Sequence, residues 1–279
     1  MEGRINESLE GIEAVFLDLD GTIYLGDELI EGSIDFLDRL ESRGIARFFL
    51  SNNSSKSVEQ YLQKLRGLGI AASRDEVLLS THDLISWLSK EGVSRTYLVG
   101  TEGMREMLEE SGLATDSADP EFVVLGYDTE VTYEKLAMAS VHLHRGVPMV
   151  SSHPDIVCPS PEGGLPDSGA YMALFEATTG VKPVHVCGKP NKGMILHKIE
   201  EMGLSPSNCA MVGDRLYTDI EMAERAGVNG ILVLSGEASK EDLAGSGPSP
   251  SLVVDSVSSL ALSLIHISEP TRLLSLAYA

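Results

Sequence analysis

Two aspartates follow a hydrophobic strand near the start of the chain, in the string VFLDLDGT at residues 15–22. Side chains alternate along a strand, so Asp18 and Asp20 are expected to leave its end on the same side, and Gly21 allows a sharp turn beyond them. Two crowded carboxylates are costly unless a cation lies between them or one holds a proton. The pattern therefore predicts a site for a divalent ion that prefers oxygen ligands, best met by Mg2+. The alternative is a loop with two solvated aspartates.

Strand and helix patterns alternate over the first seventy residues and again after residue 184, which predicts an α/β fold with a doubly wound, Rossmann-like parallel sheet. The expected strands of this core cover residues 14–17, 46–50, 184–187, 209–212 and 230–234. Helices are expected over 33–43 and 191–202, and two more should begin at the capping boxes Ser57 with Gln60 and Thr218 with Glu221.

The middle of the chain repeats the pattern on a smaller scale, with strands expected at 97–99, 122–125 and 148–151 and helices at 101–111, 132–145 and 169–179. We therefore predict a discontinuous core domain, 1–77 with 185–261, and an inserted α/β cap domain, 78–184. The string LSLIHISEPTR at 262–272 resembles a translated sequencing adapter, so 262–279 is interpreted as a non-native tail; a genuine C-terminal helix is the alternative.

The charge balance restricts the partners, because 42 acidic residues outnumber 21 basic ones and the computed pI is about 4.6. Such a field repels nucleic acid and anionic membranes, and an anionic substrate would need a metal or local cations. Three scattered cysteines do not form a disulfide framework, and Cys187 and Cys209 lie in apolar runs that predict buried thiols. With no targeting or membrane-spanning segment recognised, a cytoplasmic location is expected.

Four polar segments follow predicted strands, at the sheet edge where open α/β folds bind ligands. Asp18 and Asp20 form the first, and Ser51 with Asn52 the second, which offers a hydroxyl and backbone amides for phosphate oxygens. In the third, Lys189 can neutralise both a phosphoryl group and a carboxylate. In the fourth, GDRLYTD at 213–219, Asp214 would complete the metal site and Asp219 would hold a metal-bound water or Lys189.

In this order the four segments resemble the motifs of the haloacid dehalogenase superfamily, and residues 10–261 are most similar to its p-nitrophenyl-phosphatase-like branch with a large α/β cap. FLSNNSS at 49–55, GYD at 126–128, SSHPD at 151–155 and GKP at 188–190 also resemble that branch. This chain has Ser-His-Pro-Asp where the branch more often has Thr-Asn-Pro-Asp, and Pro166-Asp167 where it often has Pro-Gly. Both departures fall in the expected cap and bear on substrate identity.

The resemblance implies a phosphatase with an aspartyl-phosphate intermediate. Asp18 would attack phosphorus, and Asp20 would protonate the leaving alcohol and then deprotonate water. Mg2+ would be bound by the Asp18 carboxylate, the Asp20 carbonyl oxygen and Asp214, with Asp219 in support. The groups expected to bind the phosphoryl oxygens are Gly21, Ser51, Asn52, Asn53 and Lys189.

The substrate is expected to be a small phosphorylated metabolite, such as a sugar, polyol, glycolate or nucleotide-type monoester. Candidates for the leaving-group pocket are His153, Asp155 and the loop Pro166–Ala170, against which stands a purely structural turn. Asp128 is interpreted simply as the end of a cap strand, and Arg215 is expected to pair with a nearby acid rather than bind phosphate. A phosphotransferase or mutase, an inactive metabolite-binding protein, and a homodimer through the cap remain open alternatives.

Overall fold

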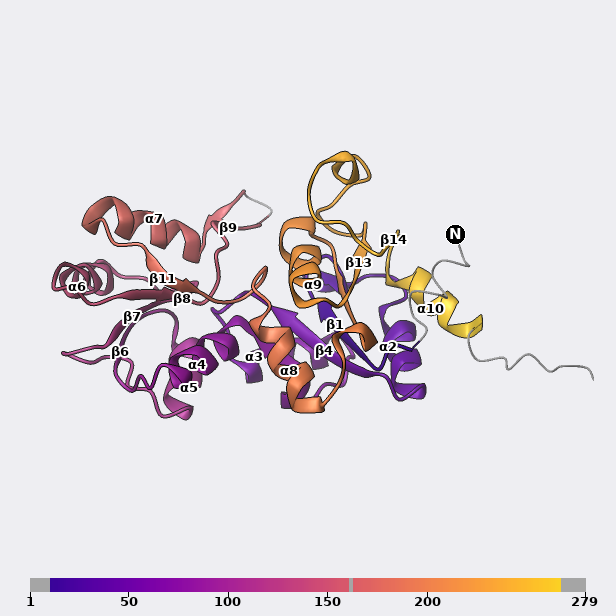
Figure 1. Ribbon diagram of the computed structural model, residues 1–279, viewed down its shortest axis with the longest axis horizontal. Helices are drawn as coiled ribbons and strands as arrows, with labels where there is room; N and C mark the ends of the chain where they lie inside the picture. Colours follow the sequence, from indigo (N-terminus) through magenta and orange to yellow (C-terminus); the bar gives the residue numbers. More distant parts are fainter. Residues whose placement is uncertain (1–10, 161–162, 267–279) are drawn as a thin grey trace, which may run out of the picture. The chain divides into compact units, whose positions relative to one another are not determined.

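The computed structural model describes residues 11–160 and 163–266, with side chains described as far as residue 261 (Figure 1). The described chain divides into two compact units. The first consists of the residues up to Arg47 and from Leu204 onward, and the second is Phe48–Gly203. Each unit contains parallel strands with helices between them, so the predicted α/β class is confirmed.

A parallel sheet forms the centre of the first unit. Its strands lie in the order β14 (Leu252–Val254), β13 (Asn229–Val233), β12 (Cys209–Gly213) and β1 (Ala14–Asp18). All five residues of β1 are buried, as expected for a parallel strand covered on both faces. The α-helices that the structure describes in this unit are α2 (Ser33–Ser42), α9 (Glu221–Ala226) and α10 (Val257–His266), and a short hairpin pairs β2 (Tyr24–Leu25) with β3 (Glu28–Leu29).

Strand β4 (Ala46–Ser51) begins in the first unit, where the Ala46 N–H donates to the Glu13 carbonyl at 2.9 Å. It ends in the second unit and pairs there in parallel with β5 (Val77–Leu79). Helix α3 (Val58–Gly67) connects the two strands, and the Gln60 Oε1 accepts the Ser57 N–H at 2.8 Å at its start. This contact confirms the backbone half of the predicted capping box.

The second unit contains a four-stranded parallel sheet in the order β11 (Pro183–Val186), β8 (Met149–Ser151), β7 (Phe122–Leu125) and β6 (Thr96–Val99). Helices α4 (Ser80–Lys90) and α5 (Glu102–Glu110) cover one face, and α6 (Tyr133–His144) and α7 (Ser168–Thr179) cover the other (Figure 1). Successive residues of β7 alternate between the two cores, Val124 on the α4 side and Val123 with Leu125 on the α6 side.

Two further elements of the second unit flank the candidate site residues. A short antiparallel pair, β9 (Val157–Cys158) and β10 (Leu165–Pro166), precedes α7. Helix α8 (Gly193–Met202) follows the Gly188–Lys189 segment, and α4 packs against it.

The thiols of Cys187 and Cys209 are buried, as predicted.

Most predicted elements are found within a residue or two of their expected bounds, but the Thr218 and Glu221 capping box is wrong. The chain forms a π-helical turn over Leu216–Ile220, and α9 begins only at Glu221. The Thr218 Oγ1 is buried without a hydrogen-bond partner, so it caps nothing. Strands β5, β9, β10 and β14 and helix α4 had not been predicted.

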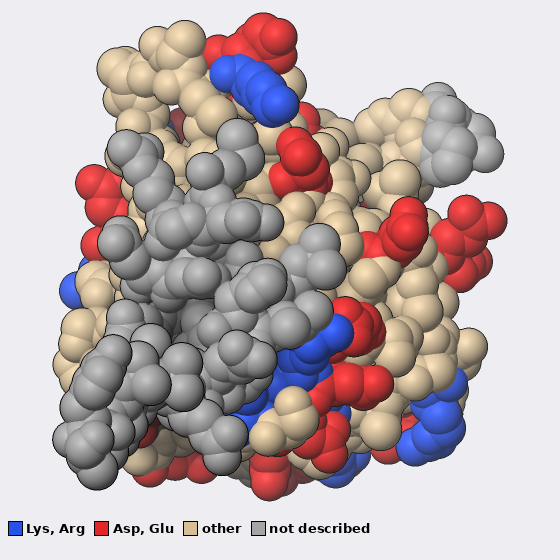
Figure 2. All heavy atoms as spheres, turned by 90° about the vertical axis from the view of Figure 1, so that its right-hand side faces the viewer, with Lys and Arg blue, Asp and Glu red and all other residues tan. Residues whose placement is uncertain are grey.

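The predicted domain boundaries at 77/78 and 184/185 stay a prediction, since the two units divide elsewhere, at 47/48 and 203/204. Of the suspected tail, residues 262–266 continue helix α10, and 267–279 lie outside the described residues. Among the helices that the structure describes, none combines the length and apolar character needed to cross a membrane. Acidic side chains spread over the face drawn in Figure 2, with basic side chains between them, in keeping with a net charge of −21.

Candidate active site

The chain turns sharply at the end of β1. Asp18 is the last residue of the strand and is 8% exposed, whereas Asp20 is exposed. Gly21 has a φ of +85°, a conformation that residues with a Cβ rarely adopt. A Cβ at this position would also lie 2.4 Å from the Asp214 Oδ2, so the carboxylate of Asp214 closes directly over the glycine. The turn thus brings the first and fourth sequence motifs into contact.

Three carboxylates gather at this turn, from Asp18, Asp214 and Asp219. One oxygen of each lies within 4.8 Å of the others, and all three residues are buried. Asp214 follows β12, and its Oδ2 accepts the Glu237 N–H at 2.7 Å. Asp219 lies in the π-helical turn, where its Oδ2 accepts the Arg215 N–H at 3.1 Å. The loop after β12 therefore presents both of its acids to the end of β1.

The electrostatics of this cluster favour a bound cation. Burial raises the pKa of Asp214 to about 7, and the negative charges of Asp18 and Asp219 add to the shift. The Asp214 Oδ1 is buried and has no hydrogen-bond partner. A divalent cation would satisfy this oxygen and offset the repulsion among the three acids, because hard cations take carboxylate oxygen ligands. The residues present therefore fit the predicted Mg2+, with Asp219 as a further candidate ligand.

Arg215, in the same loop, forms an ion pair with Glu237, with 2.9 Å between Nε and Oε2. This pairing confirms the expectation that Arg215 contacts a nearby acid. Tyr217 donates its hydroxyl to the other oxygen of the same carboxylate, at 2.7 Å. Glu237 therefore joins the π-helical turn to the segment whose backbone also holds Asp214.

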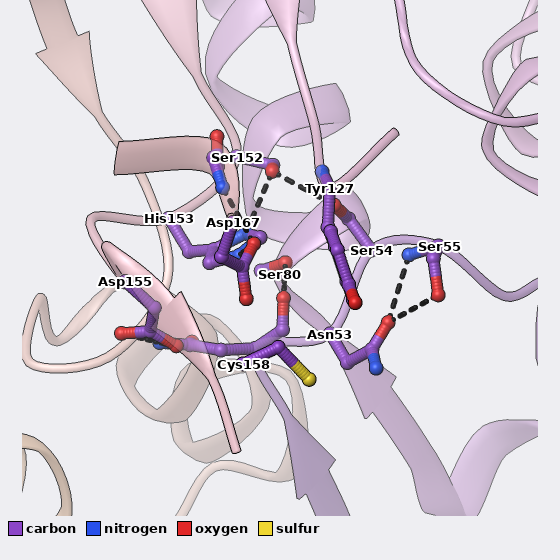
Figure 3. Close-up of polar contacts among 12 residues, drawn as sticks. Asn53, Ser54, Ser55, Ser80, Tyr127, Ser152, His153, Asp155, Cys158 and Asp167 are labelled. Atoms are coloured by element: carbon purple, nitrogen blue, oxygen red, sulfur yellow. Dashed lines mark hydrogen bonds and ion pairs between the residues drawn. The ribbon is translucent and has the colours of Figure 1, made fainter. Parts of the chain in front are cut away.

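In the second unit, the end of β4 carries the predicted phosphate-binding residues. The hydroxyl of Ser51 lies 2.8 Å from that of Tyr61 on α3 and accepts the Asn53 N–H at 3.2 Å. The Asn53 side chain does not project as a ligand but closes its own turn, since its Oδ1 accepts both the N–H and the hydroxyl of Ser55 (Figure 3). The hydroxyl of Ser51 is thus placed by α3.

The Asn52 side chain hydrogen-bonds to the backbone of Lys189. Its Oδ1 accepts the Lys189 N–H at 2.7 Å, and its Nδ2 donates to the Lys189 carbonyl at 2.9 Å. The same Nδ2 also faces the Asp155 carboxylate, with Oδ2 at 3.1 Å. The Asn52 side-chain amide therefore brings three predicted residues together, Asn52, Lys189 and Asp155, whereas the sequence had assigned only the backbone amides after β4 to phosphate.

His153 is fully buried, and both of its ring nitrogens have protein partners (Figure 3). Nδ1 lies 2.8 Å from the Ser152 Oγ, and Nε2 lies 2.8 Å from the Asp167 Oδ1. Asp167 in turn caps helix α7 by accepting the Ser168 N–H at 2.6 Å. The two departures from the family pattern thus contact each other, and this geometry favours the structural alternative for His153; its role toward substrate stays a prediction.

Two further acids of the second unit, Asp128 and Asp83, have buried or half-buried polar partners. Asp128 is buried and forms an ion pair with Lys135, 3.0 Å between Oδ2 and Nζ, so it anchors the start of α6. Asp83 on α4 was not considered from the sequence, yet its Oδ2 accepts the Gly188 N–H at 2.9 Å beside Lys189. Asp83 and Gly188 are 105 residues apart, and α4 itself had not been predicted.

Comparisons with known proteins agree on one family. Residues 15–114 match the model of haloacid dehalogenase-like (HAD-like) hydrolases, and residues 186–260 match a second model described as HAD-hydrolase-like. An acid sugar phosphatase of Staphylococcus aureus (strain MRSA252) is 36% identical over 233 residues, which cover 83% of this chain and 90% of that protein.

Solved structures give the same result. The 4-nitrophenylphosphatase of Thermotoga maritima matches with a TM-score of 0.88 and 39% identity, covering 94% of this chain and 99% of that one. A glycerol phosphate phosphatase of Mycobacterium tuberculosis, in complex with magnesium, matches with a TM-score of 0.83 and 28% identity, covering 91% and 78% of the two chains.

Proposed function

The chain belongs to the haloacid dehalogenase superfamily, in its p-nitrophenyl-phosphatase-like branch, and on that premise we propose that this phosphatase is Mg2+-dependent and hydrolyses small phosphate monoesters. One observation carries the metal requirement: three buried carboxylates meet at the end of β1, and one of their oxygens has no hydrogen-bond partner. The magnesium complex of the mycobacterial relative supports the choice of ion.

The proposed reaction has two steps and needs two acids of the first unit. In the first, the Asp18 carboxylate attacks phosphorus, the phosphorus–oxygen bond to the alcohol breaks, and Asp20 gives the alcohol its proton. In the second, Asp20 takes a proton from water, whose oxygen attacks the aspartyl-phosphate and releases inorganic phosphate. The exposure of Asp20 beside buried Asp18 supports this division, because only the proton carrier must exchange with solvent.

The bound ion would be held by Asp18, Asp214 and the carbonyl oxygen of Asp20, with Asp219 next to them. When bound, it supplies positive charge that stabilises the charge developing on the phosphoryl oxygens. Asp214 and Asp219 hold the ion without taking part in proton transfer.

Residues of the second unit are proposed to bind the phosphoryl oxygens. Ser51 supplies a hydroxyl, the amides after it supply N–H donors, and Lys189 supplies a positive charge to an anion that the acidic chain would otherwise repel. Their placement after strands β4 and β11 supports this role, as does the order of the four motifs. Asn52 contributes through Lys189 rather than as a side-chain ligand.

The relatives named as acid sugar and glycerol phosphate phosphatases suggest a polyol or sugar phosphate as substrate. We propose that the predicted cap domain, residues 78–184, selects the leaving group, and that Asp155 contacts it. A homodimer through that segment stays a prediction.

The test is phosphate release from p-nitrophenyl phosphate and from a panel of sugar, polyol, glycolate and nucleotide monoesters, with Mg2+ and with EDTA. We expect release that requires Mg2+ and is lost in Asp18→Asn. Transfer of phosphate to an added alcohol in place of release would favour the phosphotransferase alternative. No turnover of any compound by the folded, Mg2+-loaded protein would favour the binding-protein alternative and contradict the proposal.

A further inference from the structure

The backbone of the segment that carries Lys189 is held by side chains at successive positions. The Gly188 N–H donates to Asp83, the Lys189 N–H donates to Asn52, and the Lys189 carbonyl accepts from the same Asn52 amide. The Gly188 carbonyl in turn accepts the Asn191 N–H at 2.8 Å. A turn with this many fixed polar groups has little freedom to shift, so the position of the Lys189 Cα is strongly determined.

Asp83 is the unexpected member of this set. It lies in the first turn of α4, and its carboxylate closely approaches the backbone at the start of α8, since a Cβ at Gly193 would lie 2.0 Å from its Oδ1. Burial raises the pKa of Asp83, because it disfavours the charged carboxylate, and the hydrogen bond from the Gly188 N–H opposes this shift. The proposed chemical steps do not involve this residue.

Asn52 belongs to the β4 end that also carries Ser51, and its own carbonyl accepts the Ser80 hydroxyl at 2.7 Å. Ser80 and Asp83 are both on the first turn of α4. The start of helix α4 therefore contacts the segment after β4 through Ser80 and the Gly188–Lys189 backbone through Asp83. One helix thus holds both Ser51, the proposed hydroxyl donor, and Lys189, the proposed positive charge.

We propose that Asp83 and Asn52 are positioning residues that fix the Gly188–Lys189 backbone and thereby set where the Lys189 ammonium lies. The inference rests on the proposed function, in which Lys189 binds the phosphoryl group. A lysine side chain has many rotamers, so its charge is placed accurately only if the backbone is fixed. A displacement of about 1 Å at a positioned group can cost roughly 100-fold in rate.

The test compares Asp83→Leu, which keeps the branched shape but removes the acceptor for the Gly188 N–H, with Asp83→Asn, which keeps a carbonyl acceptor. Because Asn removes a charge that burial disfavours, we expect Asp83→Asn to fold. With p-nitrophenyl phosphate, kcat/KM should fall about 10- to 100-fold in Asp83→Leu and recover to within about 3-fold of wild type in Asp83→Asn. Glu91→Gln, at the exposed end of the same helix, is the control and should match wild type.

A double-mutant cycle with Lys189→Met separates positioning from general damage to the fold. If Asp83 acts through Lys189, Asp83→Leu should cost less than about 2-fold in the Lys189→Met background. The full loss in that background, or wild-type activity in Asp83→Leu alone, would overturn the inference. Wild-type activity in Lys189→Met would instead refute the proposed role of Lys189 itself, and with it the inference, by a measurement that does not involve Asp83.

Asn52, the other proposed positioning residue, keeps the inference testable if Asp83→Leu unfolds. Asn52→Asp keeps the acceptor for the Lys189 N–H but turns an oxygen, in place of the amide donor, toward the Lys189 carbonyl. The same cycle applies, and we expect a loss of at least about 10-fold that disappears in the Lys189→Met background. A loss that persists there would overturn the positioning role of Asn52.

Discussion

At the scale of single residues, the proposed cation site depends on glycines, which have no side chain, as much as on its aspartates. Gly21 and Gly236 both lie against the Asp214 carboxylate, and a Cβ at either position would come within 2.4 Å of its Oδ2. Gly21 combines this close approach with a left-handed backbone conformation. The glycine of the DLDGT string is therefore required twice over, once for the turn and once for the acid that closes over it.

Gly21→Ala should therefore weaken metal binding as well as the fold. Gly26→Ala is the matched control, because Gly26 also has a positive φ, +61°, but a Cβ there would meet nothing within 4 Å. We expect each change to lower the free energy of unfolding by at least about 1 kcal/mol for its backbone conformation. Only Gly21→Ala should also lower Mg2+ affinity, measured by titration calorimetry; equal affinities in the two variants would contradict this account of the turn.

At the scale of secondary structure, the ends of the site-bearing strands could be predicted from the sequence, but helix α4 was not predicted. The acids of DLDGT and GDRLYTD follow continuous apolar runs, so their place after β1 and β12 could be predicted from local pattern. Helix α4 buries Leu84 and Leu88 at a helical spacing, a signal that could have revealed it. Its contact with the lysine turn, and the buried pairing of His153 with Asp167, depend on long-range packing that no local pattern contains.

Helix α4 also contains a histidine, His82, whose neutral form is favoured in the folded chain. The His82 Nδ1 accepts the Leu79 N–H at 3.0 Å. Burial lowers the pKa of His82 to about 4, and the charge of Arg74 adds to the shift. Since the unfolded chain binds this proton near pH 6.5 and the folded chain does not, stability is fully present above pH 6.5 and is lost as pH falls toward 4.

We expect this one group to remove about 2 kcal/mol of unfolding free energy between pH 7 and pH 5. His82→Gln keeps an acceptor for the Leu79 N–H but does not titrate, so its stability should fall less over the same interval. Urea unfolding of both proteins at the two pH values measures the difference. Parallel pH dependences would contradict the assignment of His82 as a half-buried neutral group.

At the scale of the whole molecule, the protein must bind an anion although its net charge is −21. The buried carboxylates of the first unit add to the repulsion of an anion unless a cation is bound to them. Their burial and mutual repulsion also raise the pKa of Asp214 to about 7. Metal binding should therefore be visible in global stability. By mass action, Mg2+ at about 100 times its dissociation constant stabilises the folded state by about 2.7 kcal/mol.

Removal of the metal should distinguish wild type from Asp214→Asn. At pH 8, EDTA should lower the melting temperature of wild type but leave that of Asp214→Asn unchanged. In EDTA the variant should melt at or above the wild-type temperature, because it lacks a buried charge that opposes folding above pH 7. Differential scanning calorimetry gives both values. A Mg2+ shift of equal size in the two proteins would contradict the assignment of Asp214 as a ligand.

The most direct measurement is to find where the phosphoryl group goes during turnover. The protein is mixed with Mg2+ and p-nitrophenyl phosphate, quenched in acid within one turnover, digested, and its peptides are weighed by mass spectrometry. We predict the added mass of one phosphoryl group on the peptide that contains Asp18, and its absence in Asp18→Asn. A phosphoryl group on a different residue, or turnover by Asp18→Asn at the wild-type rate, would contradict the central claim.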